Sequence, residues 1–193
     1  MSKTTNVLIV GVGGQGVLLA TELLSAVAME AGFDAKKSEV HGMAQRGGVV
    51  SSHVRFGEKV YSPLIPEGQA DVILAFEQAE ALRWLYFAKP EGTLAINAYK
   101  LVPPIASMKG FEYPADPIGT VKARASHVTV IDAAKLAEEL GNSRLVNTIL
   151  LGVLSQSLDI DQAVWEKVIR ERVPKGTEEL NVKAFLAGRG YQA

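Results

Sequence analysis

The chain has 193 residues, no cysteine and a formal net charge of −1. Its length suits one well-buried domain, and its dispersed lysines and arginines form no basic block of the kind that binds nucleic acid. Without cysteine the chain can form no disulfide, carry no thiolate nucleophile and hold no cysteine-ligated zinc or iron–sulfur cluster.

The N-terminal residues pass directly into an apolar strand, without the hydrophobic core of a signal peptide. Outside the first predicted helix, the longest uncharged run is 145–158. That run is shorter than the roughly 18 residues that a membrane-spanning helix needs. We therefore expect a cytoplasmic protein.

The first informative feature is a glycine-rich turn after the apolar strand 6–10. The run 11–16 fits the spacing G-x-G-x-x-G, and a helix is predicted to open at Gln15 or Gly16 and to end at Gly32. Glycines in such a turn let the backbone approach a ligand, and the N–H groups of the first helical turn point at an anion. A tight turn without a ligand is the alternative. The candidate binding residues here are Gly11, Gly13, Gly14, Gln15 and Gly16.

A second predicted strand, 34–40, leads into another glycine-rich segment, Glu39–Gly48. Glu39 stands where a dinucleotide-binding fold places the carboxylate that holds the ribose. However, a glycine-rich loop and a predicted hairpin follow it in place of a second crossover helix. This departure weakens the interpretation as a nicotinamide site.

The second segment contains polar side chains suited to binding an anion. Arginine in a backbone-exposed loop can clamp a carboxylate or phosphate through two hydrogen bonds, and histidine can donate a hydrogen bond or a proton. The alternative is a surface loop whose glycines only satisfy positive φ. Since loops after parallel strands meet at the carboxyl edge of a sheet, we expect both glycine segments to be neighbours in a joint binding site or subunit contact. The candidates are His41 and Arg46 for catalysis, and Gln45, Arg46, Gly47 and Gly48 for binding.

In the middle of the chain, the sequence predicts further strands. A strand over 49–56 is expected to continue through a hairpin connection, 57–59, into an edge strand at 60–63. The apolar run 71–76 is typical of a strand covered on both faces. With the helix 77–87, the turn 89–92 and the strand 93–97, it forms a predicted β-α-β unit with parallel strands.

The rest of the chain is predicted to be mainly helical, with 101–116 left unassigned. The expected elements are a helix at 117–125, a strand at 127–131 and helices at 133–140, 145–158, 160–172 and 177–187. The uncharged helix 145–158 is either a core helix or one buried against a partner subunit, with Gly152 allowing close approach. His53 and His127 fall within strands, where a structural role is expected, and no zinc-ligand spacing is present. We predict one α/β domain over 1–193, with a Rossmann-like, mostly parallel sheet, flanking helices, an inserted β-hairpin and C-terminal helices (about 145–193) packed on it.

Several of these segments together resemble the gamma-type domain of 2-oxoacid:ferredoxin oxidoreductases, over most of residues 5–158. In chain order they are Gly13–Gly16, Arg46–Gly48, Asp71–Phe76 leading into Glu77–Trp84, Lys89–Gly92 and Asn147–Gly152. Within that family, Glu39–Gly48 resembles the beta subunits that act on indolepyruvate.

The resemblance implies a subunit of a heteromeric enzyme. Such an enzyme decarboxylates indole-3-pyruvate and other aryl pyruvates, reduces ferredoxin and releases the aryl-acetyl group as its coenzyme A thioester. The resemblance also implies that thiamine diphosphate and [4Fe–4S] clusters belong to a large alpha subunit, in agreement with the missing cysteines. This chain then holds no cofactor alone, and its glycine turn and Arg46 are expected to face an anionic group of coenzyme A or of the oxoacid. The alternatives are a gamma subunit acting on pyruvate or branched-chain 2-oxoacids, or a stand-alone NAD(P)-binding oxidoreductase or regulatory module.

Overall fold

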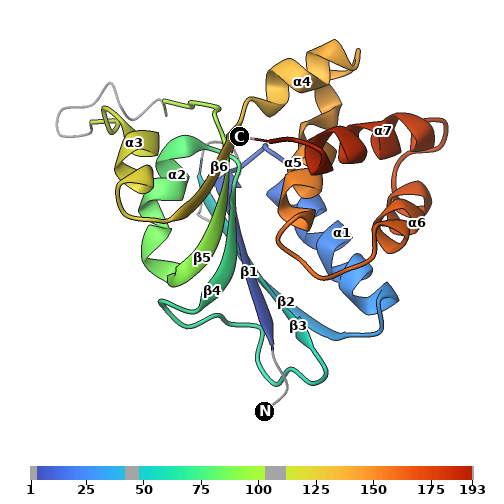
Figure 1. Ribbon diagram of the computed structural model, residues 1–193, viewed down its shortest axis with the longest axis horizontal. Helices are drawn as coiled ribbons and strands as arrows, with labels where there is room; N and C mark the ends of the chain where they lie inside the picture. Colours follow the sequence, from blue (N-terminus) through green and yellow to red (C-terminus); the bar gives the residue numbers. More distant parts are fainter. Residues whose placement is uncertain (1–3, 42–47, 103–111, 193) are drawn as a thin grey trace.

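A computed structural model describes residues 4–41, 48–102 and 112–192. Their centre is a six-stranded sheet with the strand order β2-β3-β1-β4-β5-β6 (Figure 1). The strands are β1 (Thr5–Val12), β2 (Asp34–His41), β3 (Val49–Gly57), β4 (Ala70–Ala75), β5 (Ala88–Asn97) and β6 (His127–Ile131). β1, β4, β5 and β6 pair in parallel, whereas β3 runs antiparallel to both β1 and β2. The predicted Rossmann-like, mostly parallel sheet is confirmed.

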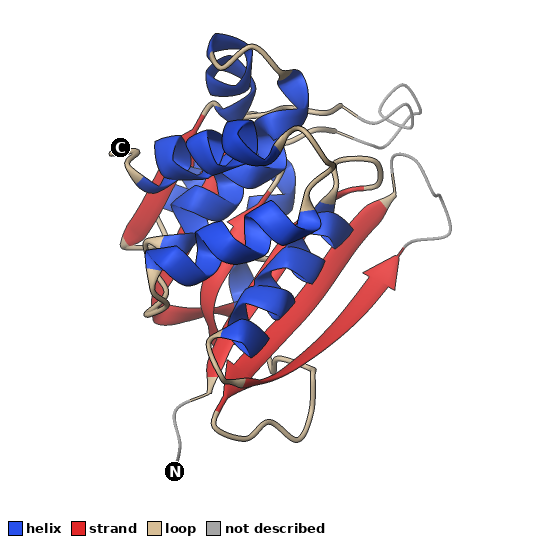
Figure 2. Cartoon of the chain, turned by 90° about the vertical axis from the view of Figure 1, so that its right-hand side faces the viewer, coloured by secondary structure: helices blue, strands red, loops and turns tan. Residues whose placement is uncertain are grey.

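Helices cover both faces of the sheet because its central strands are apolar on both sides. Along β1, Val7 and Ile9 enter one core, while Leu8 and Val10 enter the other. One face carries α1 (Val17–Glu30), α5 (Val146–Ser155), α6 (Gln162–Arg172) and α7 (Glu178–Arg189), which stand in front of the sheet in Figure 2. The opposite face carries α2 (Gln78–Arg83), the 3-10 turn η1 (Leu85–Phe87) and α3 (Pro117–Lys122) (Figure 1). The helix α4 (Ala133–Glu139) and the 3-10 turn η3 (Ser143–Leu145) connect β6 to α5.

The prediction of a hairpin between the strand 49–56 and a strand at 60–63 is wrong. β3 pairs with β2, from Asp34 opposite Gly57 to His41 opposite Val50, and residues 60–63 form no strand. Val60 is buried, but its N–H donates to the Asp34 carboxylate at 3.0 Å and has no strand partner. The Asp34 side chain therefore accepts the hydrogen bond that the Val60 N–H would otherwise donate to a neighbouring strand.

Two further elements differ from their predicted bounds. The helix expected over 77–87 divides into α2 and η1, because Glu77 forms the N-cap and Trp84 ends the α-helical part. The expected turn at 89–92 belongs to β5, whose pairing with β4 shifts register between Ala70 and Val72. The β4-α2-β5 unit nevertheless has the predicted parallel strands.

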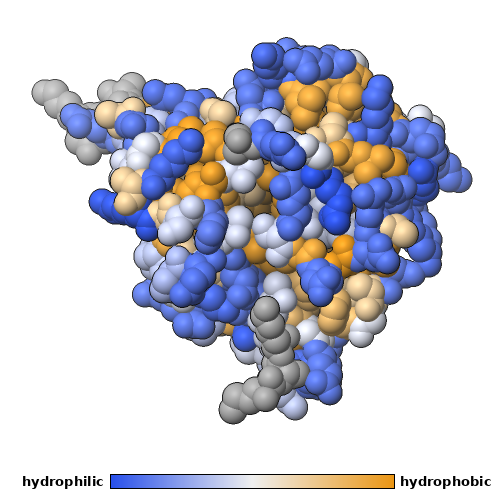
Figure 3. Space-filling view, in the orientation of Figure 1, coloured by the Kyte–Doolittle hydropathy of each residue, from blue (hydrophilic) through white to orange (hydrophobic). Residues whose placement is uncertain are grey.

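Helix α5 is a core helix, which was one of the two interpretations of the uncharged run 145–158. Its residues from Thr148 to Ser155 are buried, and it packs closely on α7. A Cβ added to Gly152 would lie 2.1 Å from the carbonyl oxygen of Phe185, and one added to Gly188 would lie 2.0 Å from that of Ile149. The close approach that Gly152 allows is thus to the chain's own α7. On the face shown in Figure 3, hydrophilic residues separate the apolar surface into several areas.

No helix in the described part of the chain is both long and apolar enough to cross a membrane.

Candidate functional site

A cavity of about 650 Å³ lies at the carboxyl edge of the sheet, where β1, β4 and β5 end. Its walls come from four stretches of the chain: the glycine turn with the start of α1, the ends of β4 and β5, the start of α4, and η3 with the start of α5. The lining residues are Gly13, Gly14, Gln15, Gly16, Leu19, Phe76, Asn97, Tyr99, Leu101, Ala134, Ser143, Arg144, Val146 and Asn147. Ligands of open α/β sheets bind at this edge, beside a change in strand order.

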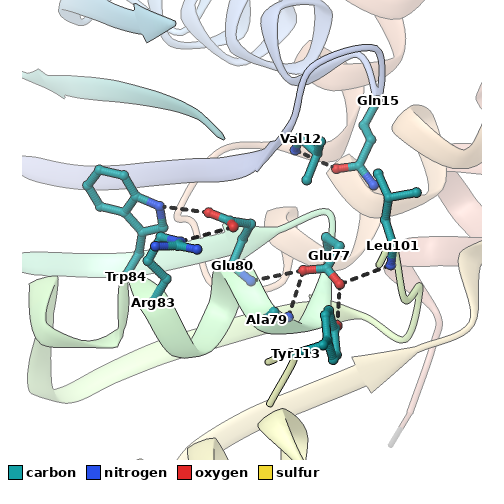
Figure 4. Close-up of polar contacts among 9 residues, drawn as sticks. All are labelled: Val12, Gln15, Glu77, Ala79, Glu80, Arg83, Trp84, Leu101 and Tyr113. Carbon is teal, nitrogen blue, oxygen red and sulfur yellow. Dashed lines mark hydrogen bonds and ion pairs between the residues drawn. The ribbon is translucent and has the colours of Figure 1, made fainter. Parts of the chain in front are cut away.

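The glycine turn is held in shape by its own hydrogen bonds. The Gln15 side chain accepts from the Val12 N–H at 2.7 Å (Figure 4). It also donates to the Phe76 carbonyl at 3.4 Å, so it joins the ends of β1 and β4. Gly14 and Gly16 have φ of 98° and 84°, a left-handed conformation that favours glycine. The turn therefore presents preformed backbone to the cavity.

The predicted turn residues have two different roles. Gly13, Gly14, Gln15 and Gly16 line the cavity, whereas Gly11 is buried at the end of β1. A Cβ on Gly11 would lie within 2.9 Å of side-chain atoms of Gln15, Phe76 and Val17. Gly11 is thus needed for packing behind the turn and does not face the cavity.

The second glycine segment reaches the first at its described end. The Gly13 N–H donates to the Gly48 carbonyl at 2.8 Å, and β1 and β2 run in the same direction because both are antiparallel to β3. The two segments are therefore neighbours, as expected. The side chain of His41 and residues 42–47, which include Gln45, Arg46 and Gly47, lie outside the described part of the structure.

Helix α1 presents an open N-terminus to this edge. Its N-cap is Gly16, which supplies no capping side chain, and its first turn contains no acidic residue. N–H groups at a helix N-terminus carry partial positive charge and favour an anion. Asn147 covers Gly16, with its side-chain amide 3.4 Å from the Gly16 carbonyl.

Arg144 is the only charged residue among the described residues that line the cavity. It is exposed, and within the described ranges its guanidinium has no hydrogen-bond or ion-pair partner. A guanidinium left free beside an open helix N-terminus favours a carboxylate or phosphate. Sequence reasoning missed Arg144, because it lies far along the chain from either glycine segment and belongs to no motif.

Two asparagines in the lining were also missed. Asn97 is buried at the end of β5, where it donates to the Phe76 carbonyl and accepts from the first N–H of α4, both at 3.3 Å. It fixes the position of α4 relative to β4. Two features of the sequence could have indicated these residues. Asn97 stands at the end of a predicted strand, and Asn147 lies in an uncharged predicted helix.

The sheet order argues against a dinucleotide site built on Glu39. In the expected pattern the acidic residue ends a strand next to β1, but here β3 separates β2 from β1. Glu39 does not line the cavity and lies 3.3 Å from the Lys37 ammonium.

The described residues do not suit a metal or a cluster. No group of three or more His, Cys, Asp or Glu side chains comes together among them, and no carboxylate lines the cavity. Iron–sulfur clusters take mainly cysteine ligands, and the magnesium ion that accompanies a diphosphate cofactor takes carboxylates. Neither an iron–sulfur cluster nor such a magnesium ion finds its ligands among the described residues, whereas an anionic ligand fits the donors around the cavity.

His53 has the structural role expected of it. It is buried in β3, its Nδ1 accepts from the Ile65 N–H at 3.2 Å, and its ring meets Phe87 edge-on. Burial lowers the pKa of this imidazole below its ordinary value of 6.5, so the neutral form is the one that the fold holds.

Comparison with known proteins identifies the family. The sequence pattern of pyruvate ferredoxin/flavodoxin oxidoreductases matches residues 6–191. The chain belongs to this family. It is 42% identical to the indolepyruvate oxidoreductase subunit IorB of Thermococcus kodakarensis, over 96% of this chain and 95% of that one.

Solved structures of ferredoxin oxidoreductases have the same fold. A keto/oxoacid ferredoxin oxidoreductase gamma subunit from Geobacter sulfurreducens matches 95% of both chains, with a TM-score of 0.70 and 24% identity. A 2-oxoglutarate:ferredoxin oxidoreductase from Magnetococcus marinus, solved with 2-oxoglutarate, coenzyme A and succinyl-CoA, matches 98% of this chain but only 31% of its own, with a TM-score of 0.74 and 19% identity. The resemblance to the gamma-type domain is confirmed, and in that last protein the fold is one part of a longer polypeptide.

Proposed function

We propose that this chain is the smaller subunit of an indolepyruvate:ferredoxin oxidoreductase in the cytoplasm. The observation that carries the proposal is the 42% identity over nearly the full length of an indolepyruvate oxidoreductase subunit. The assembled enzyme would convert an aryl 2-oxoacid and coenzyme A to the aryl-acetyl thioester and CO₂, with two electrons passing to ferredoxin. Thiamine diphosphate and [4Fe–4S] clusters would belong to a larger alpha subunit; for the clusters this agrees with the absence of cysteine from these 193 residues.

The cavity is the part of this chain that we assign to the reaction. The open N-terminus of α1 and the Arg144 guanidinium would bind an anionic group of coenzyme A or of the oxoacid. The apolar walls, with Leu19, Tyr99 and Leu101, would exclude water from the less polar part of the same molecule. These residues bind and orient, and the reacting bonds change in the partner subunit.

Exposed apolar side chains at the cavity support a larger partner. Leu19 and Tyr99 line the cavity and are 51% and 44% exposed, and the neighbouring Leu18 is 41% exposed. Large apolar side chains grouped on a surface mark interaction sites. The chain would thus form one wall of an active site that the alpha subunit completes.

The assignment is tested by producing the chain together with its thiamine-dependent, cysteine-rich partner. We expect the two to co-purify, and we expect indolepyruvate to support ferredoxin reduction better than pyruvate or a branched-chain 2-oxoacid. A preference for pyruvate or the branched-chain acid would move the enzyme to another branch of the family. Saturable NAD binding by the chain without its partner would contradict the proposal.

The cavity is tested by Arg144→Ala in that complex. Losing a charged hydrogen bond should raise the apparent KM of the ligand concerned by about tenfold or more. The ligand whose KM rises, coenzyme A or the oxoacid, identifies the anion. Arg124→Ala is the matched control, since Arg124 lies beside the opposite edge of the sheet and lines a separate cavity. If both KM values stay unchanged in Arg144→Ala, the cavity does not bind either substrate.

Arg46 is tested in the same way, on the strength of the sequence alone. Arg46→Ala should lower turnover and raise the requirement for coenzyme A or oxoacid while the complex still assembles. Unchanged kinetics would remove Arg46 from the site.

A further inference from the structure

Glu77 is a buried carboxylate that the ligand-binding proposal leaves unused. It lies two residues after the end of β4, is 1% exposed, and accepts hydrogen bonds from four groups. Burying a carboxylate is costly unless hydrogen bonds replace its water. Four donors on one side chain therefore indicate a position where several parts of the chain must be held together.

The two oxygens of this carboxylate serve different elements. Oε2 accepts from the N–H groups of Ala79 and Glu80, at 2.7 and 3.0 Å, and so caps α2. Oε1 accepts from the Leu101 N–H at 3.1 Å and from the Tyr113 hydroxyl (Figure 4). Only the first pair is explained by helix capping.

The second pair acts on the cavity wall. Leu101 lines the cavity, and so does Tyr99, whose carbonyl accepts from the Gln78 N–H at 3.1 Å. Residues 99–101 are thus fastened at both ends to the start of α2. Tyr113 joins the same carboxylate from the far side of positions 103–111, and Lys100 lies over its ring at 4.7 Å.

We propose that Glu77 is a positioning residue. It holds the Tyr99–Leu101 wall at the distance from the glycine turn that the bound substrate, with its anionic group, requires. The inference rests on the proposed ligand cavity. Glu77 does not line that cavity, so it acts through the backbone that it fixes. Burial, together with the hydrogen bond to Glu77, raises the pKa of Tyr113, so the phenol stays protonated and remains a donor to the carboxylate.

Two variants separate positioning from helix capping. Glu77→Asp keeps a charged side chain and a strong N-cap residue but withdraws the carboxylate from Leu101 and Tyr113. Tyr113→Phe removes only a donor to Oε1 and leaves the cap intact. Tyr61→Phe is the matched control, because Tyr61 is 90% exposed and lies outside the cavity.

The experiment measures two quantities in the assembled enzyme: amide hydrogen exchange at Leu101 and the kinetics of 2-oxoacid-dependent ferredoxin reduction. In Glu77→Asp we expect exchange at Leu101 to rise by about tenfold, the order of one hydrogen bond to a charged group. The KM of the substrate identified with Arg144→Ala should rise severalfold, with kcat unchanged. Tyr113→Phe should show smaller changes in the same direction, and Tyr61→Phe none.

The outcomes distinguish the two proposals. Unchanged exchange at Leu101 in both variants overturns the role of Glu77, whatever Arg144→Ala shows. Faster exchange with an unchanged KM also overturns it, provided that Arg144→Ala raises the KM and so upholds the cavity. If neither Arg144→Ala nor the Glu77 variant raises a KM, the ligand cavity itself is wrong, and the role of Glu77 fails with it.

Discussion

The two edges of the sheet use polar side chains in opposite ways. At the amino edge, Asp34, His53 and Arg55 all hydrogen-bond to the segment 58–69, which crosses that edge between β3 and β4. At the carboxyl edge, the N-terminus of α1 and the Arg144 guanidinium have no such partners among the described residues. The amino edge is thus closed by the chain itself where the segment 58–69 crosses it, and the carboxyl edge is left open around the cavity of the glycine turn.

This difference separates structural from functional polar groups. A buried polar group whose hydrogen bonds are all internal stabilises the fold, and its replacement costs stability. A polar group that faces a cavity without an internal partner is available to a ligand. Substitutions at the amino edge should therefore change stability alone, and substitutions at the carboxyl edge should change substrate affinity.

The strongest test at the closed edge is Arg55→Ala. The Arg55 side chain donates to the Asn6 amide oxygen at 2.8 Å and to the carbonyls of Ser62 and Leu64 at 2.9 and 3.1 Å. Losing these charged hydrogen bonds should lower the free energy of unfolding by about 2 to 3 kcal/mol. Urea denaturation measures this loss, and the KM values of the assembled enzyme should stay unchanged. A raised KM would show that the two edges are not independent.

A pair of glycines on α1 compares the edges directly. Gly16 precedes the helix at the cavity and Gly32 follows it at the other end, with φ of 84° and 86°. An alanine in this conformation costs about 1 to 2 kcal/mol at either position. At Gly32 nothing lies within 4 Å of the added Cβ, whereas at Gly16 it would meet the Asn147 amide nitrogen at 2.0 Å.

We therefore expect both variants to lose stability in denaturant unfolding, Gly16→Ala the more because its Cβ displaces the Asn147 amide, and we expect only Gly16→Ala to raise the KM of the substrate. Equal KM values in the two variants would mean that Asn147 and the turn do not contact the ligand.

His53 provides a smaller test through pH. Because burial lowers its pKa in the folded state, the folded protein binds fewer protons here than the unfolded chain. Its contribution to stability is complete above the ordinary pKa of 6.5 and is lost as the pH falls from there toward the folded value. Between pH 7.5 and 5, the wild type should lose stability more steeply than His53→Gln. Parallel curves from thermal unfolding would show that folding does not lower the pKa of His53.

Much of this arrangement could be predicted from the sequence, and the failures have physical causes. The hydrophobic pattern and composition of the sequence predict β6 at 127–131, with the bounds that the structure shows. The glycine spacing predicts the turn after β1. Residues 57–59 predict a hairpin connection into a strand at Val60, but no strand forms there, and the Asp34 carboxylate accepts the hydrogen bond of the Val60 N–H. The sequence does not reveal that Arg144 and Asn147 face the glycine turn, because only the packing of α5 against the turn brings them to residues about 130 positions earlier.

The smallest predicted effect is that of Asp34→Asn at the closed edge. A hydrogen bond from the Lys36 ammonium, followed by that from the Val60 N–H, lowers the pKa of Asp34 from 3.8 to about 2. A lowered folded pKa means that the carboxylate stabilises the fold above pH 3.8 and that this contribution disappears as the pH falls toward 2. The stability difference between wild type and Asp34→Asn in urea should thus be constant from pH 7 to 5 and shrink below pH 4. Since the carboxylate is far from the cavity, substrate KM at pH 7 should be the same in both proteins, and a change there would mean that the closed edge, too, influences the ligand site.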